Sequence, residues 1–242
     1  MNQNNTGLAS SIPPVTRNII IINALVWLAQ LLLTNINIER YLALHFFESD
    51  YFMPHQAITY MFLHATHDVN GSIAFTHILF NMFAVFMFGR TLETIWGAKK
   101  FLIYYMLTGI GAAIAQEIVY SIQFKEVVFN PAITTIISGA EEFSRQEFFN
   151  ILPATLGASG AVFGILVAFG MIFPNAELMM LFFPVPIKAK WFVIGYGVLE
   201  LFLGVSNNAA DNVAHFAHLG GLITGFFIIL YWKKKAKSNG HF

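Results

Sequence analysis

The sequence of 242 residues contains no cysteine and few charged side chains. The lack of cysteine excludes disulfides, thiol catalysis, cysteine-based zinc sites and iron–sulfur clusters. Charged residues make up 11% of the chain, whereas soluble domains carry about a quarter. The net charge is zero, and the one marked basic run is KKKAK at 233–237. This charge balance argues against nucleic acid as a partner.

Hydrophobic residues account for 57% of the chain, including 26 phenylalanines, which indicates an integral membrane protein surrounded by the lipid bilayer. A helix needs about 20 apolar residues to cross the bilayer. We therefore expect an all-α fold of six transmembrane helices in one domain at 18–232, between an N-terminal tail (1–17) and a basic C-terminal tail (233–242). The six predicted spans lie near 18–34, 77–95, 101–120, 157–174, 190–206 and 214–232.

The positions of Lys and Arg predict the orientation of these spans. With both termini in the cytoplasm, ten of the thirteen cations lie on the cytoplasmic side, leaving Arg40, Lys125 and Arg145 outside. The polar N-terminus lacks the pattern of a cleaved signal peptide, so we expect the first span to be an uncleaved anchor in a bacterial inner membrane. Long extracytoplasmic loops are then expected at 35–76, with short interfacial helices, and at 121–156, with a helical excursion.

A few polar side chains interrupt the predicted spans, and polar groups inside a membrane are costly enough to be functional candidates. The second, fourth and sixth spans run in one direction, and each begins with one or two of these residues. We therefore expect those residues to lie at a similar depth, near the extracytoplasmic surface. The candidates we single out are His77, Asn81, Glu117, Ser159, Glu200, His215 and His218.

Glycines in the fourth and sixth spans predict a close helix–helix contact. Gly160 and Gly164 lie one turn apart on one helix, and Gly221 and Gly225 lie one turn apart on the other. Small residues at this spacing let helix backbones approach in lipid. Such a contact would bring Ser159 within hydrogen-bond reach of a histidine, and a serine nucleophile requires a neighbouring base. Taken singly, each of these residues is better explained by helix packing or interhelical hydrogen bonding than by catalysis, and only their shared depth favours a site.

Several other chemistries are excluded by missing residues. No histidine is followed by glutamate, so the zinc-protease motif is absent, and Ala161 breaks the G-x-S-x-G pattern of esterases. The three aspartates lie outside the predicted spans, which removes an aspartyl-protease pair and the usual third member of a serine triad. Glu117 or Glu200 could orient a histidine, although snorkelling to the membrane interface is the commoner explanation.

What remains is a serine–histidine dyad without a metal or cofactor. Two histidine pairs, His64 with His67 and His215 with His218, have a spacing of three that would suit a metal. No acidic residue accompanies either pair in the sequence. We therefore expect no metal site.

Four short motifs together resemble the rhomboid family of intramembrane serine proteases. They are GASG at 157–160, AHLGGLITG at 217–225, HILFN at 77–81 and GRTLETIWGAKKF at 89–101. The loop 35–76 departs from many members because it has no tryptophan and thus no Trp-Arg pair. The connection at 65–76 and the segment 121–156 are also longer than usual for the family.

The resemblance implies a role for each matching residue. Ser159 would be the nucleophile and His218 the general base. The oxyanion hole would consist of His77, Asn81 and the backbone N–H of Ser159. Supporting roles would fall to Phe163, stacked on the histidine, to Gly157, Gly160, Gly221 and Gly225, and to Glu93 as a structural residue on the cytoplasmic side.

The expected function is therefore an endopeptidase that cleaves transmembrane segments of single-span membrane proteins. A catalytically silent rhomboid-like protein that binds membrane helices is the main alternative. A transporter is disfavoured because no polar path continues through the cytoplasmic half of the spans. The sequence leaves the oligomeric state and the natural substrate open.

Overall fold

The computed structural model describes residues 12–68, 70–138, 141–180, 183–206 and 214–238, and it is predominantly helical. Five helices are long and apolar enough to cross a membrane: Pro14–Leu32 (α1), Phe75–Trp96, Ala98–Gln123 (α6), Ala189–Ser206 (α10) and His215–Ser238 (α11). The second of these consists of α4 (Phe75–Ala84), a π-helical turn η3 (Val85–Gly89) and α5 (Arg90–Trp96). The chain is thus an integral, multi-pass membrane protein, as predicted.

The predicted fourth span is shorter than expected. It forms α9 (Ser159–Ile172), a helix of 14 residues, where the sequence predicts 157–174. Gly157 has a positive φ of 128°, which an L side chain rarely adopts, so the helix begins only after this residue. At the other end the helix stops before Pro174, which restricts the residue that precedes it.

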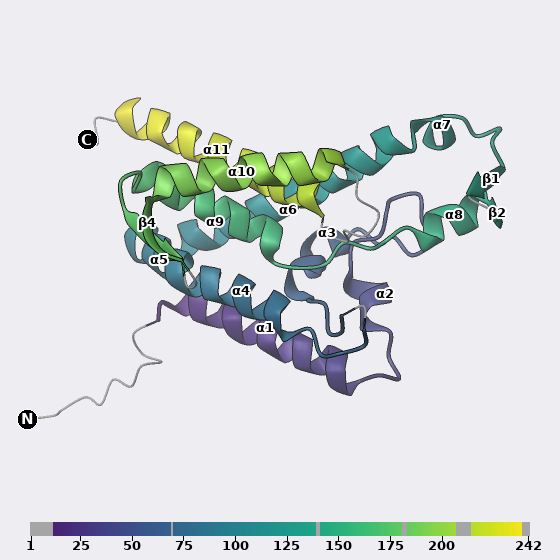
Figure 1. Cartoon of the computed structure of the whole chain (residues 1–242), viewed down its shortest axis with the longest axis horizontal. Coiled ribbons are helices and arrows are strands. Elements are labelled where there is room, and N and C mark those ends of the chain that lie inside the picture. Colours follow the sequence, from purple (N-terminus) through teal and green to yellow (C-terminus); the bar gives the residue numbers. More distant parts are fainter. Residues whose placement is uncertain (1–11, 69, 139–140, 181–182, 207–213, 239–242) are drawn as a thin grey trace, which may run out of the picture.

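α9 occupies the centre of the helical bundle. It contacts α6, α10 and α11 as well as α4, η3 and α5, and Figure 1 shows it between the α1–α4 side and the α10–α11 side. Ten of its residues are buried, including the run Gly160–Ala168. A helix that is apolar all round and covered by neighbours is a core helix, and α9 fulfils that role here.

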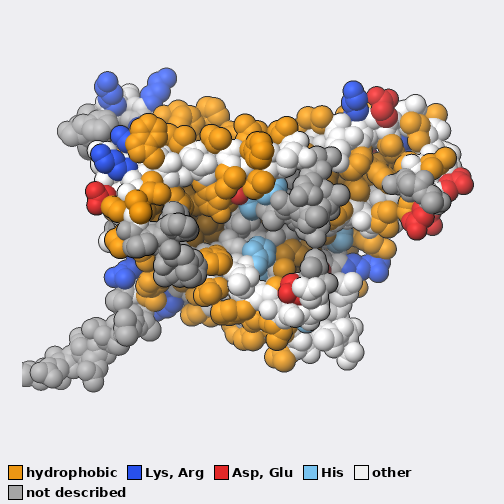
Figure 2. Space-filling view, in the orientation of Figure 1, with side chains coloured by type: hydrophobic (Ala, Val, Ile, Leu, Met, Phe, Trp, Pro, Cys, Tyr) orange, Lys and Arg blue, Asp and Glu red, His pale blue; other side chains and the backbone are white. Residues whose placement is uncertain are grey.

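The other long helices expose large hydrophobic side chains on their outer surfaces. Leu25, Ile114, Phe202 and Phe227 are each more than half exposed, and Figure 2 shows wide belts of hydrophobic side chains on one face. A soluble monomer rarely exposes contiguous apolar patches of this extent. This surface fits contact with lipid chains.

Two small β-hairpins correct the prediction of an all-α fold. In the segment 121–156, expected to be helical, β1 (Thr135–Ser138) pairs antiparallel with β2 (Glu141–Ser144), between α7 (Lys125–Val128) and α8 (Arg145–Ile151). The run TTII at 134–137 contains only β-branched residues, which favour strands.

The second hairpin joins α9 to α10. It pairs β3 (Glu177–Met180) with β4 (Phe183–Lys188) in antiparallel register, with a bulge between Met179 and Met180. Prolines at 184 and 186 prevent a helix here because proline disrupts helix interiors.

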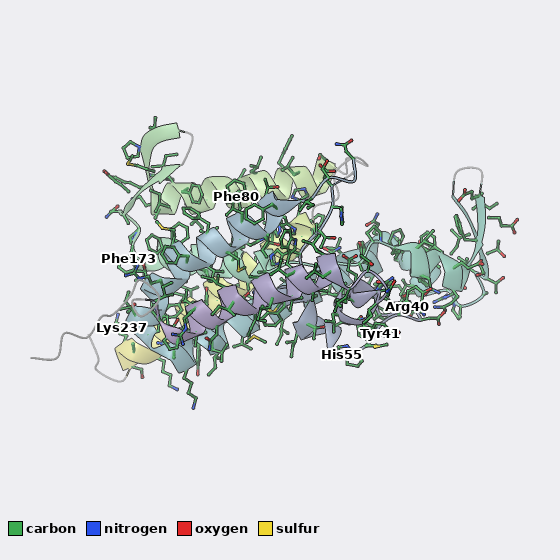
Figure 3. The ribbon with its side chains drawn as sticks, turned by 90° about the horizontal axis from the view of Figure 1, so that it is seen from below. Arg40, Tyr41, His55, Phe80, Phe173 and Lys237 are labelled. Atoms are coloured by element: carbon green, nitrogen blue, oxygen red, sulfur yellow. The ribbon has the colours of Figure 1, made fainter. Side chains whose placement is uncertain are left out.

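The first loop contains short helices, as the sequence predicts, within otherwise irregular chain. They are α2 (Ile38–Leu42), α3 (Gln56–Thr59) and the 3₁₀ turn η2 (Tyr60–Phe62). The long connection at 65–76 includes a tight turn in which Asp68 Oδ1 accepts hydrogen bonds from the N–H groups of Asn70 and Ser72. In Figure 3, Arg40, Tyr41 and His55 of this loop lie at the end of the molecule opposite Phe173 and Lys237.

The start of α1 and the end of α11 lie at the same end of the molecule, opposite α7, α8 and the first hairpin (Figure 1). More Lys and Arg side chains gather at the end that carries the termini (Figure 2). Which end faces the cytoplasm stays a prediction. α1 begins at Pro14 and α11 continues to Ser238, while residues 1–11 and 239–242 of the predicted tails lie outside the described residues.

Glu93 of α5 makes hydrogen bonds to the N-terminus of α1. Its carboxylate accepts hydrogen bonds from the N–H groups of Val15 and Thr16 at 2.9 and 2.7 Å and from the Thr16 hydroxyl at 2.7 Å. The first N–H groups of a helix have no partner within the helix, so a carboxylate stabilises them. This contact agrees with the structural role that the resemblance implies for Glu93.

Candidate active site

Ser159 and His218 meet at the contact between α9 and α11. Ser159 is the first residue of α9, and His218 lies in the first turn of α11. The Oγ atom of Ser159 is 2.7 Å from Nε2 of His218, which is hydrogen-bonding distance. The structure therefore brings the two predicted catalytic residues together from positions 59 residues apart in the sequence.

The predicted glycines account for this short distance. A side chain at Gly221 would overlap the backbone carbonyl of Gly160, and one at Gly225 would come within 3.1 Å of the Gly164 Cα atom. The two pairs therefore face each other across the α9–α11 contact, one helical turn apart. Backbone-to-backbone contact holds the two helices close enough for the serine and histidine to interact.

Gly160 and Gly164 also allow a second close contact, which the sequence analysis did not foresee. Side chains at these positions would overlap Ala112 and Thr108 of α6. α9 is thus packed closely against α11 on one side and α6 on another. Tight packing on two sides fixes the position of the serine at its N-terminus.

Glu200 of α10 extends the serine–histidine pair. One oxygen of its carboxylate, Oε2, lies 2.9 Å from Nδ1 of His218 and 2.7 Å from Nδ1 of His215. Glu200 is 4% exposed, so of the two roles considered for it, orienting a histidine fits this contact and snorkelling to the membrane interface does not. The serine–histidine pair predicted from the sequence therefore has a carboxylate next to the histidine. It comes from a glutamate of α10, whereas no aspartate lies inside the predicted spans.

Phe163 stacks on the ring of His218, as the resemblance implies. The two ring centroids are 4.5 Å apart and the ring planes differ by 12°. The Phe163 ring also contacts Tyr196 of α10, with centroids 4.8 Å apart. His218 is therefore restrained by an aromatic face, by the carboxylate at Nδ1 and by the serine at Nε2.

His77 and Ser159 both lie beside Gly157. A side chain at Gly157 would meet Nε2 of His77 at 3.3 Å and Oγ of Ser159 at 3.6 Å. The space left by this missing side chain is therefore bordered by both residues. The Ala65 N–H lies 3.4 Å from Nδ1 of His77, so Nδ1 is the acceptor and Nε2 carries the hydrogen.

Asn81 is buried one turn further along α4. Its Nδ2 atom donates to the carbonyl of His77 at 3.0 Å, which leaves the second amide hydrogen for another acceptor. The two residues lie on one face of the helix, as their spacing predicts. This hydrogen bond, made within α4, fixes the orientation of the Asn81 side-chain amide.

His64 is a buried neighbour that the sequence analysis considered only for a metal pair. Its ring packs edge-on against His77, with centroids 5.1 Å apart, and neither ring nitrogen has a hydrogen-bond partner among the described residues. Burial, assisted by the nearby His77, lowers the pKa of His64 from 6.5 to about 3. His64 is thus a neutral packing surface for His77 at physiological pH.

One group of side chains has the chemistry of a metal site. Donor atoms of Glu200, His215 and His218 all lie within 4.8 Å of one another. No acidic residue lies beside this histidine pair in the sequence, and the folded chain supplies one from α10. The Glu200 oxygen already accepts from both histidines, and this hydrogen bonding accounts for the cluster without a cation.

Comparison with known proteins relates this chain to one protein family. The family model of the rhomboid domain matches residues 52–235. Rhomboid protein 1, mitochondrial, of Saccharomyces cerevisiae is 29% identical over 171 residues, covering 68% of this chain and 40% of that protein. Rhomboid protease GluP of Bacillus subtilis is 28% identical over 158 residues, covering 64% of this chain and 23% of that protein.

The matched region spans less than half the length of either relative. The family model, in contrast, covers most of this chain, and its range includes Ser159, His218, His77 and Asn81. By this match, the chain belongs to the rhomboid family.

Proposed function

We propose that the chain is an intramembrane serine endopeptidase that cleaves transmembrane segments of single-span membrane proteins. The observation that carries the proposal is the 2.7 Å contact between Ser159 Oγ and His218 Nε2, made across a glycine-lined helix contact inside a membrane bundle. A hydroxyl of normal reactivity becomes a nucleophile when a base accepts its proton. Family membership and the printed name of one relative, a rhomboid protease, agree with this chemistry.

In the proposed reaction, Ser159 Oγ attacks the scissile carbonyl carbon while its proton passes to His218 Nε2. The carbonyl oxygen becomes an oxyanion, stabilised by the Nε2–H of His77, the Asn81 amide and the Ser159 N–H. One such donor contributes about 3–4 kcal/mol of transition-state stabilisation. His218 then protonates the leaving amine as the C–N bond breaks, and water hydrolyses the acyl-enzyme.

A substrate helix must unwind locally before its carbonyl can be attacked, because helical carbonyls are already hydrogen-bonded. We therefore expect cleavage near glycine, proline or other weak helix formers. The proposed location is a bacterial inner membrane with both termini in the cytoplasm. No cofactor takes part in the proposed mechanism.

Labelling by a serine-directed fluorophosphonate tests the proposal without knowledge of the substrate. Wild-type protein should be labelled, and Ser159→Ala and His218→Ala should not be. Ser121→Ala is the matched control, since the Ser121 hydroxyl donates to the Glu117 backbone carbonyl at 2.7 Å and should leave labelling unchanged. Equal labelling of wild type and Ser159→Ala would contradict the proposal and favour a silent, helix-binding rhomboid-like protein.

Orientation can be tested separately because the sequence has no cysteine. A membrane-impermeant maleimide should label Glu126→Cys in intact cells, since Glu126 is exposed in α7. It should label Lys237→Cys only after permeabilisation. The reverse pattern would place the termini outside.

A further inference from the structure

Glu200 is a buried carboxylate on a helix that buries little else. Among the described residues of α10, only Ala189 and Glu200 are buried, and Phe202 nearby is 68% exposed. A carboxylate within a membrane-spanning helix is costly unless charge partners and hydrogen bonds compensate for the lost water. The contacts of Glu200 with His215 and His218 therefore indicate what this buried carboxylate does.

The bond to Glu200 determines which nitrogen of His218 carries a hydrogen. An ionised carboxylate only accepts hydrogen bonds, so Nδ1 of His218, 2.9 Å from Oε2, is the donor. The lone pair is then on Nε2, which is 2.7 Å from Ser159 Oγ. This is the tautomer that a base needs in order to accept the serine proton.

His215 holds the same carboxylate oxygen from a second direction. It lies three residues before His218 on α11, so the two rings project from one helix face. Its Nδ1 is 2.7 Å from Oε2 of Glu200. Among the described residues, the other titratable groups that face this cluster are Tyr196 on α10 and His77 on α4.

We propose that Glu200 is a positioning residue, so that Ser159, His218 and Glu200 act as a triad in which His215 fixes the carboxylate. The inference rests on the proposed function. During acylation the proton moves from Ser159 Oγ to His218 Nε2, and the carboxylate stays ionised beside the imidazolium. The leaving amine takes the proton from Nε2, which returns His218 to its starting tautomer. Glu200 contacts His218 and not the reacting atoms.

The decisive variant is Glu200→Gln, which keeps the volume of the side chain and removes its charge. Its kcat for cleavage of a single-span reporter should fall by about 10²–10⁴-fold with little change in KM. The acidic limb of its pH–rate profile should move to lower pH, because the imidazolium loses its carboxylate partner. Thermal unfolding in detergent should change little. Glu200→Asp restores the carboxylate and should recover part of kcat and the wild-type acidic limb.

Glu117→Gln is the matched control. Glu117 is another carboxylate inside a membrane-spanning helix, and its Oε2 accepts a hydrogen bond from the Phe47 N–H at 3.0 Å. Among the described residues, no hydrogen bond or ion pair joins the Glu117 side chain to Ser159 or His218. This variant should therefore keep the wild-type kcat and pH profile.

Several outcomes would overturn the proposal. One is a folded Glu200→Gln variant with the wild-type kcat and pH profile. Another is a kcat loss that follows a fall in thermal stability, with no shift of the pH profile, since that indicates a purely structural role. A wild type that neither cleaves any reporter nor shows Ser159-dependent labelling would instead overturn the protease function itself, and the role of Glu200 with it.

Discussion

The glycines of α9 and α11 differ from those of α10 in what surrounds them. A side chain at Gly221 would overlap the backbone of α9, whereas at Gly195 there is nothing within 4 Å. α9 is covered on all sides, while α10 is largely exposed and contributes Glu200 to the site. The serine and the histidine are therefore fixed by backbone packing, whereas the carboxylate that contacts the histidine comes from a largely exposed helix.

The largest effect is expected for Gly221→Ala. The added methyl group has no space against the Gly160 carbonyl, so α9 and α11 must separate. Overpacking of this kind costs about 1–3 kcal/mol or more, and the added separation would pull His218 away from Ser159. We expect loss of reporter cleavage together with a lower unfolding temperature in detergent. An active variant of wild-type stability would show that the contact is not tight.

A smaller effect on folding, but a marked one on activity, is expected for Gly157→Ala. The φ of 128° strains any L side chain by about 1–3 kcal/mol, and the methyl group would lie 3.3 Å from Nε2 of His77. Reporter cleavage should fall more than stability. Gly71→Ala is the control, because Gly71 has a φ of 76° with open space around it and should lose only stability.

The buried rings beside the serine should also respond to pH. Burial first, and His77 second, lower the pKa of His64 to about 3, whereas the unfolded chain has the ordinary value of 6.5. Between these values the unfolded state binds a proton that the folded state does not, so stability falls as pH drops from about 6.5 towards 3. Unfolding in detergent across this range should show the loss. His64→Phe should flatten the dependence, and an unchanged slope would contradict this origin.

The smallest effect is expected on α10. Gly195→Ala adds a methyl group in open space, and alanine favours a helix by up to about 1 kcal/mol relative to glycine. The unfolding temperature should stay the same or rise slightly, with unchanged cleavage. Gly197→Ala, whose methyl group would lie 3.1 Å from the flexible end of Leu222, should be nearly as mild. A large loss from Gly195→Ala would mean that α10 has a partner on that face.

Much of the bundle could be predicted from the sequence because lipid imposes a simple pattern on spanning helices. The serine, the histidines and the asparagine interrupt otherwise apolar runs, so they were visible as candidates. The glycine pairs at a spacing of four indicated which helices touch. The two hairpins were not predicted, since short strands of four to six residues carry a weak pattern beside long apolar helices.

The role of Glu200 stays open from the sequence alone. Its place near the end of a span is compatible both with orienting a histidine and with snorkelling to the membrane interface, and the second is the commoner case. A signal was present nonetheless: Glu200 lies near the end of one span, and His215 and His218 lie at the start of the next. Two consecutive spans run in opposite directions, so these positions share a depth. The contact itself depends on which faces the two helices turn towards each other, and that is set by packing.

The length of α9 has a consequence for where a substrate would be cut. Its 14 residues span about 21 Å at about 1.5 Å per residue, whereas the hydrocarbon core is about 30 Å thick. With Ile172 at one hydrocarbon boundary, Ser159 lies about 9 Å inside the other, a depth equal to about six residues of a substrate helix. Under the proposed function, the number of residues between the membrane surface and the cut is therefore set by the length of this one central helix and by the thickness of the surrounding bilayer.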